Sequence, residues 1–71
     1  MTDVSDIDSE ARGFIAENAS QASYWADLAR EAATIRDDKL LAYATRKAAA
    51  YARAFVGAAK DMLLAKEGGT T

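Results

Sequence analysis

Apolar and small residues recur at alternating intervals of four and three positions through the first half of the chain. This spacing places them on one face of an α-helix, because side chains three and four apart lie above one another. The repeating positions are Ile7, Ala11, Phe14, Asn18, Gln21, Trp25, Leu28, Ala32 and Ile35. The pattern predicts a first helix over about residues 6–35.

The same spacing returns after a short interruption, and it predicts a second helix over about residues 39–66. Asp37 and Asp38 are good helix N-caps, so we expect a turn at about residues 36–38. Gly68 is the expected stop, with a disordered tail over residues 67–71. The repeating positions of this second helix are Leu41, Ala44, Ala48, Tyr51, Phe55, Ala58, Met62 and Ala65.

Two helices of this length joined by so short a turn must lie antiparallel. The chain lacks proline and is rich in alanine, which also favours an all-α fold. Residues 1–71 are therefore predicted to form one helical-hairpin domain. Ile15, Val56 and Leu63 widen the apolar stripes beyond what two helices can bury, and small chains often gain stability by oligomerising. We therefore expect a homodimer, in which two hairpins pair into a four-helix bundle.

Acidic residues recur every seven positions along one helix and basic residues along the other. The expected ion pairs between the helices are Glu31 with Lys39, Glu17 with Arg53, and Glu10 with Lys60. The net charge of −2 makes general nucleic-acid binding a poor fit. One alternative function is nevertheless a small dimeric nucleic-acid-associated regulator whose two basic edges follow a phosphate backbone. A purely structural or assembly module is another alternative.

The chain contains neither cysteine nor histidine. Their absence excludes disulfides and ordinary zinc, haem or iron–sulfur ligation, and it leaves no conventional nucleophile–base pair. We therefore predict that the protein is not an enzyme and has no catalytic residues, cofactor or metal. The acidic start of the chain is unlike a signal peptide, and no apolar run is long enough to cross a membrane. These features favour a cytoplasmic protein that does not engage membranes.

Asn18 and Gln21 introduce polar groups into the repeating face of the first helix. If the helix is continuous, they lie opposite Phe55 and Tyr51, and the Gln21 amide can bond the Tyr51 hydroxyl. Such a polar layer fixes helix register at some cost in stability. The alternative is a break in the helix near residues 18–20, because Asn18 and Gln21 also match the spacing of a capping box.

The larger side chains divide into an inward set and an outward set. Tyr24 and Tyr43 fall off the repeating faces, and exposed tyrosine beside arginine is typical of protein-binding hot spots. We therefore predict a partner-binding surface at Tyr24, Tyr43, Arg46 and Arg53, although isolated surface tyrosines are also common. The predicted core and dimer seam comprises Phe14, Asn18, Gln21, Trp25, Leu28, Tyr51, Phe55 and Met62.

The stretch NASQASYWADLAREA resembles the first helix of a family of very small phage-encoded quorum-sensing anti-activators. The resemblance is carried by Asn18, the pair Tyr24-Trp25, Leu28 and the pair Glu31-Ala32. It covers about residues 14–35, and the second helix has no matching feature. The resemblance implies a dimeric helical hairpin that binds and inhibits a bacterial host protein. The implied targets are a LuxR-type transcriptional activator or the assembly ATPase of type IV pili.

Overall fold

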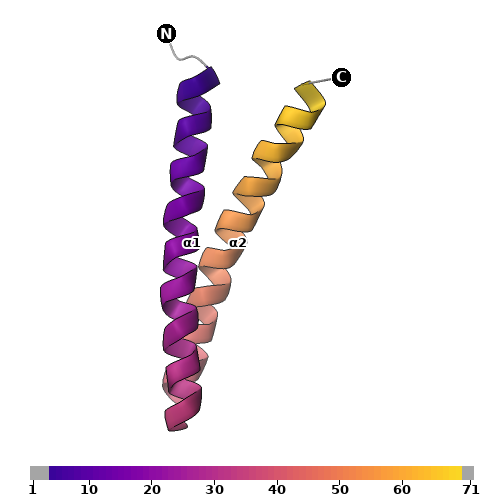
Figure 1. Ribbon diagram of the computed structural model, residues 1–71. Coiled ribbons are helices and arrows are strands. Elements are labelled where there is room, and N and C mark those ends of the chain that lie inside the picture. The colour runs from indigo at the N-terminus through magenta and orange to yellow at the C-terminus, as the bar shows by residue number, and fades with distance from the viewer. Residues whose placement is uncertain (1–3, 70–71) are drawn as a thin grey trace.

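The computed structural model shows two long helices joined by a tight turn (Figure 1). It describes residues 4–69, with side chains over residues 8–66. Helix α1 spans Val4–Ile35 and helix α2 spans Asp38–Gly69. The two helices run antiparallel and pack against each other, so the predicted all-α helical hairpin is confirmed.

Helix α1 continues without interruption through its polar stretch, so the alternative of a break near residues 18–20 is wrong. The Asn18 Nδ2 donates a hydrogen bond of 2.9 Å to the Phe14 carbonyl oxygen, one turn back in the same helix. This local bond satisfies the amide without ending the helix. The predicted bond between Gln21 and Tyr51 is absent among the described side chains, because Gln21 is turned toward solvent.

The end of α1 is a Schellman motif centred on Arg36. The Arg36 amide donates to the Ala33 carbonyl oxygen at 3.3 Å, and the Asp37 amide donates to the Ala32 carbonyl oxygen at 2.9 Å. Arg36 has a φ of 60°, the left-handed conformation that glycine usually provides in this motif. The turn therefore forms without glycine, at the cost of holding a side chain in a disfavoured backbone conformation.

The start of α2 is capped by Asp37. Its Oδ1 accepts a hydrogen bond of 3.1 Å from the Leu40 amide, and its carbonyl oxygen accepts one of 2.9 Å from the Leu41 amide. These two bonds are the signature of an N-cap residue. Of the two aspartates predicted for this role, Asp37 is therefore the cap, and Asp38 is the first residue of the helix.

Both helices extend beyond their predicted outer ends. Helix α2 continues through Gly69, so the stop expected at Gly68 is wrong, whereas the disorder expected over residues 67–69 stays a prediction. Ala65 is a strong helix former, and the positive charge of Lys66 in the last turn favours the negative end of the helix dipole. The remainder of the predicted tail, residues 70–71, lies outside the described residues.

The buried core consists of alanine. Among residues 8–66, the buried positions are Ala22, Ala32 and Ala44, and the latter two have no exposed surface at all. Ala32 and Ala44 lie close to the turn on facing helices. Because a methyl group is small, these positions let the two helix axes approach closely. The tightest packing therefore lies in the half of the hairpin nearest the turn.

The helices diverge away from this contact, and their outer ends are well separated (Figure 1). The radius of gyration is 16.0 Å, whereas about 11 Å is typical of a compact chain of this length. The accessible surface is 5485 Å², whereas about 4,300 Å² is typical of a compact protein with this mass. The isolated hairpin thus exposes about 1,200 Å² more surface than a compact domain.

Several large apolar side chains remain exposed in the hairpin. Phe14 and Ile35 belong to the predicted inward face, yet they are 51% and 62% exposed. Phe14 lies where the helices have separated, and Ile35 is the last residue of α1, so neither is covered by the other helix. The other exposed members are Tyr24, Tyr43, Val56, Leu63 and Leu64.

The ion pairs differ from those expected between the two charged edges. None of the three predicted glutamate pairs forms among the described side chains. Instead, Asp8 pairs with Arg12 at 2.7 Å and with Lys66 at 3.4 Å, and Asp27 pairs with Arg30 at 3.3 Å. Exposed pairs contribute only about 0–1 kcal/mol each, so they are too weak to impose a register on the alanine contact.

Candidate protein-binding site

Three aromatic rings form a connected row near the turn end of the hairpin. The Tyr24 and Trp25 rings, both from α1, meet edge to face with centroids 5.2 Å apart. Trp25 also meets Tyr43 of α2 edge to face, with centroids 5.5 Å apart. Edge-to-face contacts between aromatic rings are favourable, by about 0.5–1.5 kcal/mol beyond their buried area. The row therefore links the two helices and fixes the orientation of all three rings.

Lys47 extends this row at its α2 end. Its Nζ lies 5.6 Å from the centroid of the Tyr43 ring, within the range of a cation–π interaction. We call Tyr24, Trp25, Tyr43 and Lys47 the aromatic row. Sequence reasoning missed Lys47 as a site residue, although the spacing of four residues from Tyr43 places both on one helix face.

The two tyrosines form the accessible part of the aromatic row. Tyr24 is 61% exposed and Tyr43 is 47% exposed. Trp25 lies between them and is partly buried, and its indole Nε1 is buried without a hydrogen-bond partner among the described residues. Trp25 is thus held by ring packing, and it supports two tyrosines that face solvent.

The other predicted binding residues, Arg46 and Arg53, are also exposed on α2. Neither takes part in an ion pair with another described side chain. The structure brings Tyr24 and Tyr43 to the same tryptophan, but it shows no contact that joins either arginine to the aromatic row. Of the predicted seam, Phe14 and Gln21 are exposed, whereas the other members, Asn18, Trp25, Leu28, Tyr51, Phe55 and Met62, are partly buried.

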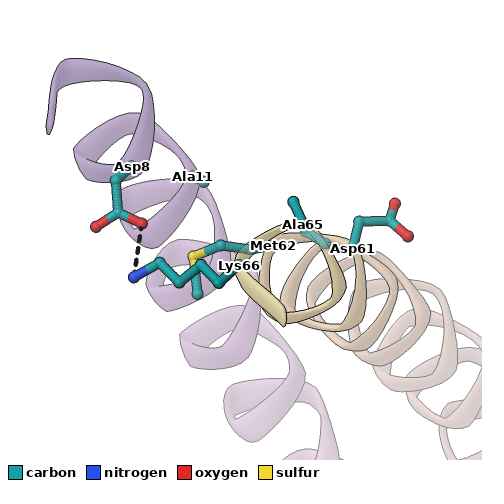
Figure 2. A pocket seen from close by; sticks show the side chains of 7 residues that line it. Asp8, Ala11, Asp61, Met62, Ala65 and Lys66 are labelled. Atoms are coloured by element: carbon teal, nitrogen blue, oxygen red, sulfur yellow. Dashed lines mark ion pairs between the residues drawn. The ribbon is translucent and has the colours of Figure 1, made fainter. Parts of the chain in front are cut away.

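A second surface feature lies at the opposite end of the hairpin, where the helices have separated. It is a groove with a volume of about 580 Å³. We call it the open-end groove, and its lining residues are Asp8, Ala11, Ala58, Asp61, Met62, Ala65 and Lys66. In Figure 2, Met62 and Lys66 reach from α2 toward α1, whereas Asp61 points away.

Asp8 carries the main electrostatic feature of this groove. The hydrogen bond from Arg12 lowers the pKa of the Asp8 carboxyl below its usual value of 3.8, and the bond from Lys66 lowers it further. The Lys66 contact is the pair drawn as a dashed line in Figure 2, and it spans the two helices. The groove therefore has an ionised carboxylate, paired with Lys66 across the two helices, among its lining side chains.

The described part of the chain offers no group of three or more side chains suited to hold a metal ion. Within residues 4–69, neither helix is long and apolar enough to cross a membrane. Comparisons with protein-family models, curated proteins and solved structures give no match. The aromatic row and the open-end groove are therefore the two candidate binding surfaces of the described residues.

Proposed function

We propose that this protein is a non-enzymatic homodimer that binds another protein through its aromatic row and inhibits it. The observation that carries the proposal is the exposure of Tyr24 and Tyr43 on either side of a shared tryptophan. Tyrosine, tryptophan and basic side chains are the usual anchors of protein–protein interfaces. Their rings are already fixed by mutual contact, so little side-chain freedom is lost when a partner binds.

Dimerisation is supported by the large surface of the isolated hairpin. Pairing two hairpins into a four-helix bundle covers apolar side chains that one hairpin leaves in water. Phe14 and Leu63 are both more than half exposed, and each is large enough to contribute to such a core. A dimer also presents two aromatic rows to a target, which raises the apparent affinity for a target with two sites.

The nature of the target rests on the resemblance of residues 14–35 to phage-encoded anti-activators. The pair Tyr24-Trp25, which carries part of that resemblance, is also part of the aromatic row. We therefore propose a bacterial host protein as the target, either a LuxR-type transcriptional activator or the assembly ATPase of type IV pili. Inhibition follows if the hairpin occupies a surface that the target needs for its own assembly or for binding DNA.

The test measures binding of the full chain to a purified LuxR-type activator and to a purified pilus ATPase, together with capture from bacterial lysate and mass spectrometry. We expect Tyr24→Ala and Tyr43→Ala each to weaken binding at least tenfold, the loss typical of an interface anchor. Leu64→Ala removes a side chain outside the aromatic row that is 63% exposed, close to the 61% of Tyr24, and serves as the matched control.

Three results would count against the proposal. If both tyrosine variants bind with the affinity of the wild type, the binding surface lies elsewhere. Failure of both purified targets, with another protein captured specifically, would overturn the target class but not the binding function. Failure to capture any specific partner would overturn the binding function itself.

A further inference from the structure

The open-end groove is an apolar surface that the hairpin leaves uncovered. Four of its seven lining residues are apolar: Ala11 from α1, and Ala58, Met62 and Ala65 from α2. Figure 2 shows Met62 reaching from α2 toward α1. Phe14 lies three residues beyond Ala11, on the same side of α1, and it is 51% exposed. Helices pack against each other by fitting large side chains of one against small side chains of the other, and this region offers both kinds.

The excess surface of the whole hairpin is large enough for an interface with one additional copy of the chain. The hairpin exposes about 1,200 Å² more than a compact protein of its mass. A stable protein–protein interface removes about 600–1,000 Å² from each partner. One further hairpin seated on the groove therefore brings each chain close to the surface of a compact domain.

The charges at the groove suit contact with an identical surface. Asp8 and Asp61 are acidic, and Lys66 is basic, so the lining contains both signs of charge. A two-fold dimer brings the same patch of each protomer together, and a patch of one sign would then repel itself. A patch with both signs can instead place acidic groups of one copy near basic groups of the other.

We infer that the open-end groove is the homodimer interface, and that the turn half of each hairpin lies outside it. This inference rests on the proposed dimer and assigns it a location. Ala11 and Trp25 are separated by fourteen helical residues, which is about 21 Å along the axis of α1. Dimerisation through the groove therefore leaves the aromatic row of each protomer accessible to a target. Self-association and target binding then depend on separate residues.

The experiment measures molar mass by light scattering and sedimentation equilibrium over a range of protein concentrations. Ala65→Glu is the main variant, because Ala65 lines the groove yet is exposed in the hairpin, so the change leaves the hairpin itself intact. Met62→Glu is a second variant that introduces a charge between the two helices. Leu64→Glu is the matched control, since consecutive helical residues point in different directions and Leu64 is not part of the groove lining.

We expect the wild type and Leu64→Glu to be dimers, and Ala65→Glu to dissociate with at least a tenfold higher dimer Kd. Circular dichroism checks that the Ala65→Glu variant retains its helix content. A wild-type dimer that Ala65→Glu leaves unchanged would overturn the groove assignment alone. Equal dissociation of Leu64→Glu would overturn it as well, because the interface would then extend around α2. A monomeric wild type, or one that forms larger oligomers, would overturn both the groove assignment and the proposed dimer.

Target binding is measured separately on the same variants. We expect the Ala65→Glu monomer to bind an immobilised single-site target as well as the wild-type protomer does, because its aromatic row is unchanged. Loss of binding by this folded variant would show that the groove also contacts the target, against the proposed separation. Absence of a target for the wild type would affect the proposed function and not the location of the dimer interface.

Discussion

The two halves of the hairpin share one sequence pattern but differ in packing. In the turn half, Ala32 and Ala44 are completely buried and the aromatic row links α1 with α2. In the open half, Phe14 is half exposed and a groove separates the helices. Figure 1 shows the consequence, because the helices touch near the turn and diverge toward the two ends of the chain.

This difference shows that the spacing of apolar residues and their size control separate properties. Spacing determines which face of each helix turns toward the other. Size determines how closely the two axes approach, because alanine permits a shorter distance than phenylalanine or methionine. A close contact at one end, combined with an angle between two nearly straight helices, leaves space at the other end. The two helices are thus closely packed in the turn half, whereas the open half contains a groove.

The largest expected effect comes from filling the alanine contact. Ala44→Leu adds three carbon atoms at a position without exposed surface, so we expect a loss of about 1–3 kcal/mol in the free energy of unfolding. Ala42→Leu makes the same chemical change at an exposed position two residues away, and we expect a change within about 0.5 kcal/mol. Urea denaturation at one fixed protein concentration measures both. Equal stability of the two variants would show that the turn half is not tightly packed.

An intermediate effect is expected at the turn itself. Arg36 has a positive φ, so Arg36→Gly relieves a backbone cost, and we expect stability to rise by about 0.5–1 kcal/mol. Arg36→Ala removes the same long side chain but keeps the Cβ atom, so we expect no comparable gain. Thermal denaturation of both variants measures the difference. A glycine variant less stable than the alanine variant would contradict the left-handed conformation at this residue.

The sequence predicted the parts of the fold that depend on local chemistry and periodicity. The repeating positions correctly placed Ala32 and Ala44 on facing surfaces, and the aspartates before the second helix predicted the cap that Asp37 provides. The resulting antiparallel hairpin follows from these two features.

Other features depend on the angle between the helices, which no short motif specifies. That angle brings Trp25 against Tyr43, whose outward position was predicted but whose contact with tryptophan was not. It also leaves Phe14 exposed. The sequence therefore singled out the two tyrosines of the candidate site. Their contacts with Trp25, and the position of Lys47 over the Tyr43 ring, became visible only in the structure.

The smallest expected effect concerns Asp8, which has one cationic partner within its own helix and one across the groove. The bond with Arg12 is the larger cause of its lowered pKa, and the bond with Lys66 is the smaller. We therefore expect Arg12→Ala to raise the Asp8 pKa toward 3.8 more than Lys66→Ala does. Titration of the Asp8 carboxyl carbon by NMR measures this pKa in each variant.

The sign of the pH dependence follows from the lowered pKa. The folded state favours the ionised carboxylate, so its stabilising effect is complete above the unfolded pKa of about 3.9 and is lost as pH falls through the lower folded value. If the bond with Arg12 is the larger cause of the lowered pKa, protonation of Asp8 mainly breaks a contact within α1. A second copy could then bind at the open half without first breaking a strong ion pair between the helices. A larger pKa change for Lys66→Ala would instead show that the ion pair across the groove holds the two helices together, and the contrast between the two halves would then be smaller than the geometry indicates.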